Sequence, residues 1–169
     1  MKHNNLILIG MPGCGKSTVG VVCAKILGYD FLDCDIYIQK KHGKLLWELI
    51  EENGCEDFIK IEQSALCEIE CESHIIATGG SAVYGERAME HLKGQGKVVY
   101  LSLSLDKVRE HIGNTGTSRG VVYRNGSDLE TLYYERTPLY EKYADVIIDC
   151  NKLSVMEAAR KIADAADGI

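Results

Sequence analysis

The residues at positions 10 to 18 carry the clearest chemical signal in the chain. They read Gly10-Met11-Pro12-Gly13-Cys14-Gly15-Lys16-Ser17-Thr18 and fit the pattern G-x-x-x-x-G-K-[ST], whose glycines let successive backbone N–H groups converge on one phosphate. Lys16 adds a mobile charge for the β- and γ-phosphates of a nucleotide, and the Ser17 hydroxyl can ligate Mg²⁺. The residues expected to contact the nucleotide are Gly13, Cys14, Gly15, Lys16, Ser17 and Thr18.

Two carboxylates follow a second apolar stretch. Residues 31–32 start a strand that we expect to end at 33–35, and residues two apart on a strand point to the same side. The C-terminal ends of parallel strands gather beside the phosphate loop, so Asp33 and Asp35 are predicted to face the phosphates. Mg²⁺ and a substrate hydroxyl would relieve the repulsion between these two charges. The alternative is that Asp35 only caps the helix that follows it.

Two further segments are predicted to lie on the same side of the sheet. The turn Thr78-Gly79-Gly80-Ser81 follows a third apolar strand and therefore faces the ligand, unless it is a simple turn. The polar, glycine-rich stretch 113–120 is typical of a mobile lid. Arg119 within it can close onto phosphate oxygens, and the alternative is an arginine in solvent.

Alternating strands and helices must position these groups. The expected strands are 5–9, 31–35, 74–77, 97–102 and 144–149. The expected helices are 17–27, two or three within 36–72 with breaks at Gly43 and Gly54 (one of them 56–71), 105–112, 127–143 and 154–166. This order predicts an α/β fold with a five-stranded parallel sheet covered by helices on both faces.

Length and composition narrow the class of protein. The 169 residues fit one domain, and the net charge of −6 with 46% apolar residues gives no basic field for nucleic acid or an anionic membrane. No apolar run approaches the length of a membrane span, so we expect a cytoplasmic protein, a monomer, with a small-molecule substrate. Seven cysteines, an odd number, are predicted to be free thiols.

With these landmarks in order, the sequence resembles the shikimate kinases over nearly its whole length. The matching stretches are 10–18, 31–35, 54–62, 78–80, Arg119 and 136–140. The resemblance implies a P-loop kinase fold forming a single domain over 1–169. Within it, 36–72 would be the substrate-binding helical region and 112–126 the lid.

The resemblance also implies the reaction, which is ATP-dependent conversion of shikimate to shikimate 3-phosphate in aromatic amino-acid biosynthesis. Ser17 and Asp33 would serve Mg²⁺, and Arg119 would reach the ATP phosphates. The implied catalytic residues are Lys16, Asp35 and Arg119. The implied substrate-binding residues are Asp35, Gly79, Gly80 and Arg136.

Three positions depart from the family pattern, all near the acceptor. Ile59 stands where the family has a second arginine for the substrate carboxylate, Ser81 replaces a third glycine, and Gly120 replaces a proline after Arg119. Lys60 lies about 100° around the helix from position 59, so it substitutes for that arginine only if the helix rotates or the side chain reaches. Another small polyol or hydroxy acid is therefore an alternative acceptor.

Other classes of nucleotide-binding protein remain as alternatives. A nucleoside monophosphate kinase would need basic residues to hold the acceptor's phosphate, and 36–72 offers Lys40, Lys41, Lys44 and Lys60 but no arginine. A switch GTPase would need N-K-x-D, and residues 151–154 end in Ser154 where the carboxylate is required. A nonenzymatic relative that binds ATP without an acceptor is the remaining alternative.

Overall fold

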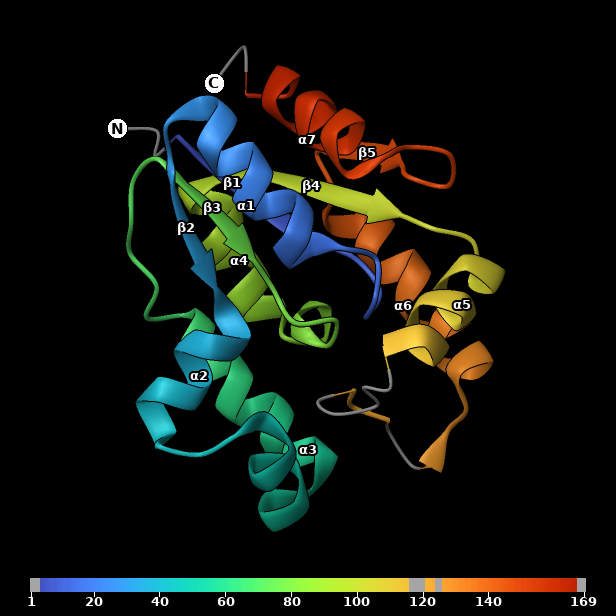
Figure 1. The fold of residues 1–169 in the computed structure, drawn as a ribbon. Helices are drawn as coiled ribbons and strands as arrows, with labels where there is room; N and C mark the ends of the chain where they lie inside the picture. The colour runs from blue at the N-terminus through green and yellow to red at the C-terminus, as the bar shows by residue number, and fades with distance from the viewer. Residues whose placement is uncertain (1–3, 116–120, 124–125, 167–169) are drawn as a thin grey trace.

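The computed structural model describes residues 4–115, 121–123 and 126–166 of the chain. Its five strands form one parallel sheet in the order β2-β3-β1-β4-β5 (Figure 1). The strands are β1 Asn5–Ile9, β2 Asp30–Asp33, β3 His74–Ala77, β4 Gly96–Ser102 and β5 Val146–Asp149. The helices are α1 Lys16–Leu27, α2 Cys34–His42, α3 Leu46–Leu66, the 3₁₀ turn η1 Ala82–Tyr84, α4 Glu86–Gln95, α5 Leu105–Thr115, α6 Leu129–Tyr143 and α7 Val155–Asp164. The predicted α/β class and parallel sheet are confirmed.

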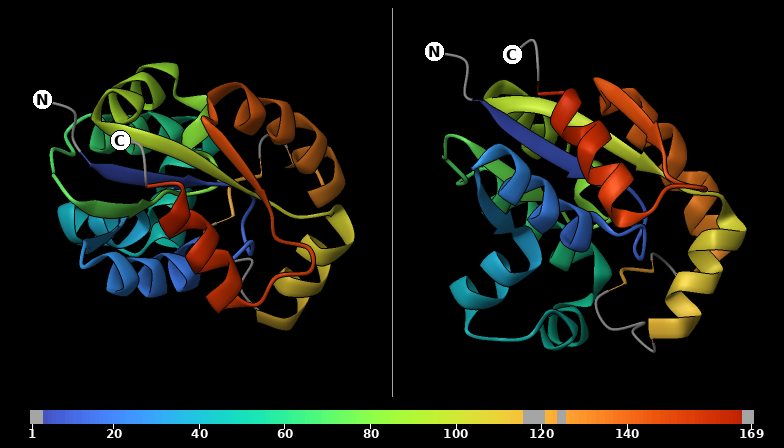
Figure 2. Two further views of the ribbon diagram at one scale, coloured as in Figure 1. Left: turned by 90° about the horizontal axis from the view of Figure 1, so that it is seen from above. Right: turned by 45° about the horizontal axis from the view of Figure 1, so that its top comes forward.

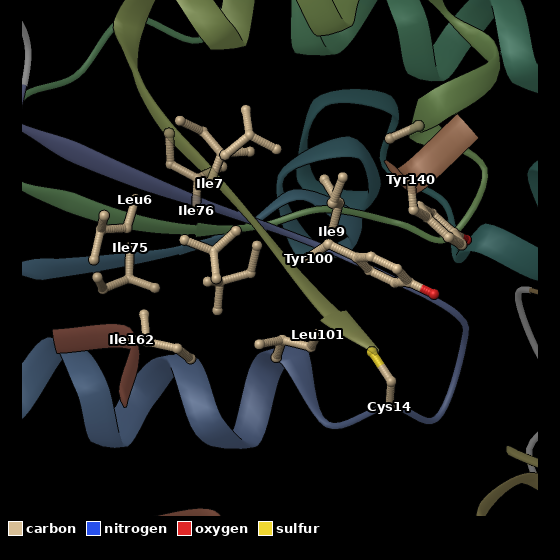
Figure 3. Close-up of a cluster of buried hydrophobic side chains, with 14 of the residues drawn as sticks. Leu6, Ile7, Ile9, Cys14, Ile75, Ile76, Tyr100, Leu101, Tyr140 and Ile162 are labelled. Carbon is tan, nitrogen blue, oxygen red and sulfur yellow. The ribbon is translucent and has the colours of Figure 1, made fainter. Parts of the chain in front are cut away.

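The core is built around β1, which lies between β3 and β4. Leu6, Ile7, Leu8 and Ile9 are all fully buried, as expected for a parallel strand covered on both faces. Figure 3 shows Leu6, Ile7 and Ile9 among apolar side chains of the neighbouring strands and of α7. The continuous apolar run that predicted this strand is therefore explained by its central position.

Helices cover both faces of the sheet. Figure 2 shows α1 and α7 on one side and α4 and α6 on the other. Gly20 lets α1 lie close to the sheet, because a Cβ there would be 2.7 Å from the Phe31 ring and 3.2 Å from Leu8. This close packing fixes the position of the loop that leads into α1.

The helical region after β2 is interrupted where its glycines predicted. Gly43 ends α2 with φ 65°, and Gly54 has φ 77° and ψ 166° inside α3, values that favour glycine. The breaks at both positions are confirmed. The last helical segment ends at Leu66, however, not at residue 71, and η1 and α4 were not predicted from the sequence.

Asn5 joins three segments at the amino ends of the strands. Its Nδ2 donates to the carbonyls of Cys71 at 2.7 Å and Gln95 at 3.1 Å, and its Oδ1 accepts from the backbone N–H of His74 at 2.9 Å. Asn5 is completely buried, so these bonds satisfy a polar side chain that would otherwise destabilise the core.

The cysteines and the apolar character of the helices bear on two of the predictions. All seven cysteines are free thiols, as predicted. Within the described residues, no helix has both the length and the apolar character that a membrane span requires.

Candidate active site

The loop between β1 and α1 has the backbone conformation that its glycines predicted. Gly10, Gly13 and Gly15 have φ values of 148°, 76° and 91°. A Cβ at Gly10 would also lie 2.7 Å from the Leu101 carbonyl oxygen. Glycine is therefore required in this loop both for its torsions and for its close packing on the end of β4.

Lys16 lies within this loop and not in solvent. Its ammonium group donates to the carbonyl oxygens of Gly10 at 2.8 Å and Met11 at 3.0 Å, and the residue is only 8% exposed. Its Nζ also lies 3.6 Å from the Cys14 thiol. The loop thus holds one positive charge beside its converging N–H groups, which is the arrangement that binds phosphate.

The Ser17 hydroxyl donates to Asp33 Oδ2 at 2.7 Å and so links α1 to the end of β2. The other Asp33 oxygen accepts from the backbone N–H groups of Asp35 at 2.9 Å and Ile36 at 3.2 Å. Asp33 is therefore the N-cap of α2. The strand predicted to run from 31 to 33–35 ends at Asp33, so its extension over 34–35 was wrong because the chain becomes helical at Cys34. The alternative with Asp35 as the cap was also wrong, since Asp33 is the cap.

One cavity of about 420 Å³ extends from the phosphate loop to α3 and the turn after β3. Its loop side is lined by Pro12, Gly13, Gly15, Lys16, Ser17 and Thr18. Its far side is lined by Asp35, Leu46, Phe58, Glu62, Thr78, Gly79, Gly80 and Ser81, and Ile112 and Val121 complete the wall. Of the predicted phosphate-loop side chains, Cys14 alone lies elsewhere, packed in the core beside the end of β4 (Figure 3).

Two carboxyl groups line this cavity, of which Glu62 is buried and Asp35 is half-buried. Burial, with the neighbouring Asp33 carboxylate, raises the pKa of Asp35 to about 6, although Lys16 opposes the shift. Burial also raises the pKa of Glu62 to about 7, and the nearby Asp35 carboxylate raises it further. The hydrogen bond from Ser81 and the positive charges of Arg136 and Lys16 act in the opposite direction. A carboxyl whose pKa lies near neutrality can exchange a proton under working conditions.

Glu62 was not among the predicted site residues. It lies four residues after Phe58 on α3, so both side chains project from the same face of the helix into the cavity. That spacing was visible in the sequence. The burial of Glu62 could not be predicted from the sequence, because a glutamate among apolar residues is usually exposed to solvent.

Gly79 and Gly80 bring the backbone after β3 against these groups, as predicted for a ligand-facing turn. A Cβ on Gly79 would collide with Glu62 and lie 3.0 Å from Asp35 Oδ1. A Cβ on Gly80 would lie 2.8 Å from Pro12 and 2.9 Å from Arg136 Nη1. A side chain at either position would therefore clash with these neighbours, so the close approach of this turn requires glycine.

Arg136 enters from α6 and is completely buried. Its Nη2 donates to the Val122 carbonyl at 2.6 Å, and its Nε donates to the Tyr84 hydroxyl at 3.2 Å. Its Nη1 is buried and has no hydrogen-bond partner among the described residues. An unpaired guanidinium N–H is costly unless an anion accepts from it, so this atom marks a site for an acidic ligand.

A family model for shikimate kinase matches residues 12–167. The chain belongs to the shikimate kinase family. A shikimate kinase of Clostridium botulinum (strain Alaska E43 / Type E3) is 37% identical over 164 residues, covering 94% of this chain and 96% of the relative. One from Francisella tularensis subsp. novicida (strain U112) is 35% identical, covering 96% and 94%.

Solved structures of the shikimate kinase family agree with the fold. The shikimate kinase from Acinetobacter baumannii in complex with shikimate superposes with a TM-score of 0.86 at 31% identity, covering 95% of this chain and 91% of that one. The enzyme from Aquifex aeolicus gives a TM-score of 0.80 at 27% identity, covering 97% and 96%.

The position where the shikimate kinase pattern has a second arginine is apolar here. Ile59 packs beside the cluster that contains Phe58 and Leu49. Lys60 does not take the arginine's place, because it is exposed on α3 and forms an ion pair with Asp57 at 2.6 Å. Among the described residues, the arginine closest to this part of the cavity wall is Arg136, whose Nη1 lies behind Gly80.

The stretch predicted as a lid, 112–126, is described in part. Helix α5 continues to Thr115, so the first residues of the stretch predicted as a loop are helical. Ile112 and Val121, which lie on either side of residues 116–120, both line the cavity. Arg119 lies outside the described residues, and its contact with phosphate stays a prediction.

Proposed function

We propose that this chain transfers the γ-phosphoryl group of ATP to a ring hydroxyl of shikimate, giving shikimate 3-phosphate for aromatic amino-acid biosynthesis. One observation carries the proposal. A single cavity joins the phosphate loop to the half-buried carboxyl of Asp35 and ends at Gly80, next to the unpaired guanidinium N–H of Arg136. Phosphate, hydroxyl and carboxylate are the three chemical features that the site must recognise.

The nucleotide end is assigned to the residues of the phosphate loop. Backbone N–H groups from 13 to 18 and the Lys16 ammonium would hold the β- and γ-phosphates. Lys16 would exchange its bonds to the Gly10 and Met11 carbonyls for phosphate oxygens, which are stronger partners because they are charged. Residues 112–126 would act as the lid, with Arg119 as a further phosphate ligand.

Ser17 and Asp33 are the residues that we assign to Mg²⁺. Their oxygens lie 2.7 Å apart, and hard oxygen donors of this kind suit a small divalent cation. When bound, the ion would neutralise charge on the phosphates during transfer.

Asp35 is assigned as the group that receives the proton of the attacking hydroxyl. As the hydroxyl oxygen bonds to the γ-phosphorus, the bond from that phosphorus to the bridging oxygen of ADP breaks, and the hydroxyl proton passes to Asp35. Gly79 and Gly80 would admit the acceptor close to the backbone, and Arg136 would pair with its carboxylate. Residues 36–72 would form the acceptor-binding region.

Two observations favour an acceptor other than shikimate as the second candidate. Ile59 is apolar, and Lys60 is exposed in an ion pair with Asp57, so neither supplies a second positive charge for a carboxylate. With one buried guanidinium, the site also suits a related polyol or hydroxy acid. The test is ADP release with MgATP and a panel containing shikimate, quinate and other hydroxylated acids, with the product identified by mass spectrometry. No phosphorylated product from any of them would overturn the assignment as a small-molecule kinase.

A further inference from the structure

Tyr140 lies on α6 at the place where the phosphate loop and the turn after β3 meet. Its hydroxyl donates to the Gly80 carbonyl at 2.6 Å and lies 3.9 Å from the Met11 sulfur. Met11 belongs to the phosphate loop and Gly80 to the turn after β3. One buried hydroxyl therefore contacts both the segment that we assign to the nucleotide and the segment that we assign to the acceptor.

The ring of Tyr140 is held against the sheet. It stacks on the Tyr100 ring of β4 with a centroid separation of 5.1 Å and an interplanar angle of 28° (Figure 3). Both residues are almost completely buried, so close packing limits the movement of the two rings. The position of the Tyr140 hydroxyl relative to β4 is thus set by packing as well as by its own hydrogen bond.

The turn that Tyr140 contacts is also attached to β1. At the start of the turn, Thr78 donates to the Leu8 carbonyl from its backbone N–H at 3.1 Å and from its hydroxyl at 3.0 Å. Gly80 lies two residues beyond this attachment and accepts from Tyr140. The turn is therefore held at two points, one on the sheet and one on α6.

Between these two points the turn is pressed against the phosphate loop. A Cβ at Gly80 would lie 2.8 Å from Pro12 Cδ and 2.9 Å from Arg136 Nη1. Such packing contacts resist compression, but they are not directional and allow sliding. A hydrogen bond depends on direction as well as distance, so the bond from Tyr140 fixes the turn in the directions that packing leaves free.

The Tyr140 hydroxyl remains a donor at working pH. Burial raises the pKa of this hydroxyl, although the positive charge of Arg136 acts in the opposite direction. Within the described part of the chain, the residues that line the cavity include Gly80 but not Tyr140. Tyr140 therefore acts on the site through Gly80 and not by touching a ligand.

We propose that Tyr140 is a positioning residue that sets the distance and alignment between the phosphate loop and the turn after β3. Transfer requires the γ-phosphorus and the attacking oxygen to be in line, and a misplacement of about 1 Å can cost about 10²-fold in rate. This assignment of Tyr140 rests on the proposed function in taking the reaction to be phosphoryl transfer across this cavity.

The test is Tyr140→Phe, which keeps the ring that stacks on Tyr100 and removes only the hydroxyl oxygen. Steady-state rates are measured with MgATP and shikimate, and the affinity for each is measured by calorimetry. We expect kcat to fall about 10-fold to 100-fold, because the substrates bind but are poorly aligned. The dissociation constants should change less than about 3-fold, since no group that contacts ATP or shikimate is removed.

Tyr133→Phe is the matched control. Tyr133 lies on the same helix, and its hydroxyl also donates to a backbone carbonyl, that of Leu103, at 2.9 Å. The two variants lose the same group and the same kind of bond, so their melting temperatures should fall by similar amounts. Only Tyr140→Phe should lose kcat, because the Tyr133 bond joins α6 to the segment after β4 and not to the turn after β3.

A variant that restores a donor tests the hydrogen bond itself. Replacement of Tyr140 by 4-aminophenylalanine places an N–H group where the hydroxyl lies, so the side chain can again donate to the Gly80 carbonyl. This variant should recover most of the kcat that Tyr140→Phe loses. Equal rates for the two variants would show that the hydrogen bond does not position the turn, and would overturn the inference.

The outcomes distinguish this inference from the proposed function. An unchanged kcat in Tyr140→Phe would overturn the inference, while transfer to shikimate would leave the function standing. Equal losses of kcat in Tyr133→Phe and Tyr140→Phe, or a Tyr140→Phe protein that does not fold, would make the hydroxyl purely structural and would also overturn the inference.

The acceptor panel covers the remaining outcomes. If the unmodified protein phosphorylates another member of the panel and not shikimate, the proposed acceptor is wrong, and the same comparison of kcat with that acceptor decides the inference. No transfer by the unmodified protein to any acceptor would overturn both the function and the role of Tyr140.

Discussion

Ser17 and Asp33 are joined by a 2.7 Å hydrogen bond between the first turn of α1 and the N-cap of α2. Asp33 caps α2 and is also our proposed Mg²⁺ ligand, and variants can separate these two roles. Ser17→Ala should raise the Mg²⁺ concentration needed for half-maximal rate without lowering stability. Asp33→Ala should raise it too and also cost about 0.5–2 kcal/mol of unfolding free energy through the lost cap. Magnesium titrations and urea denaturation measure the two effects, and an unchanged magnesium requirement in both variants would remove these residues from the metal site.

Lys16→Ala should lower the rate by about 10²-fold or more, because it removes a preorganised charge from the phosphates. It also removes two hydrogen bonds within the loop, to Gly10 and Met11. Steady-state rates and calorimetric ATP affinity check this expectation. Normal turnover and ATP binding in the variant would contradict the assignment of this loop to the nucleotide.

Asp35→Asn should lower the rate by about 10² to 10⁴-fold and leave ATP affinity intact, because the amide cannot take a proton. In the unmodified protein, burial raises the pKa of Asp35 to about 6. The ionised form is the base, so kcat/KM for the acceptor should rise with pH through about 6. A pH–rate profile that is flat between pH 5 and 7 would argue against Asp35 as the base.

The stability of the ligand-free protein should fall as pH rises between about 5 and 8. Asp35 and Glu62 have pKa values of about 6 and about 7 in the folded chain, above their ordinary values, so folding favours their protonated forms. Their stabilisation is complete at low pH and is lost as pH rises through those values. Asp149 and Glu157, whose pKa values are lowered by hydrogen bonds, are already ionised in this range and contribute no slope. Melting temperatures should fall by a few degrees, at about 2–4 °C per kcal/mol.

Glu62→Gln tests the origin of this slope, because glutamine does not ionise. Its melting temperature should vary less with pH over the same range than that of the unmodified protein. An identical slope in the variant would assign the effect to other groups.

Ile59→Arg should lower the KM for shikimate by about 10-fold to 150-fold if shikimate is the acceptor, since a second guanidinium would reach its carboxylate. Lys60→Ala should leave that KM unchanged, because Lys60 is exposed and paired with Asp57. A tight KM in the unmodified protein that Ile59→Arg does not improve would show that Arg136 alone suffices.

The strands and the phosphate loop could be predicted because their signals are local. A buried strand is predicted directly by the apolar run over residues 5–9, and the turn after it by the glycines at 10, 13 and 15. Helix α4 was missed because its polar residues mask a narrow apolar stripe of Ala88, Met89 and Leu92. Its position depends on packing against β4, which the local sequence does not express.

The candidate site was predictable where a motif fixed it and not where packing did. Asp33 and Asp35 were found, but their geometry was wrong because the N-cap bonds of Asp33 turn the chain into a helix earlier than strand alternation assumes. The hydrogen bond between Glu62 and Ser81 joins segments 19 residues apart, so the local sequence does not express it. The outward direction of Lys60 likewise depends on how α3 sits on the core.

The Asn5 contacts lie at the amino ends of the strands, whereas the phosphate loop, Asp33 and Gly79 follow the carboxyl ends. One end of the sheet is thus tied together by a buried amide, and the other end holds the cavity that we assign to the ligands. Part of the resistance to unfolding therefore comes from contacts that lie far from the proposed ligand site. Sequence changes that adapt the acceptor end to a new substrate can accumulate with little effect on the contacts that hold the strands together.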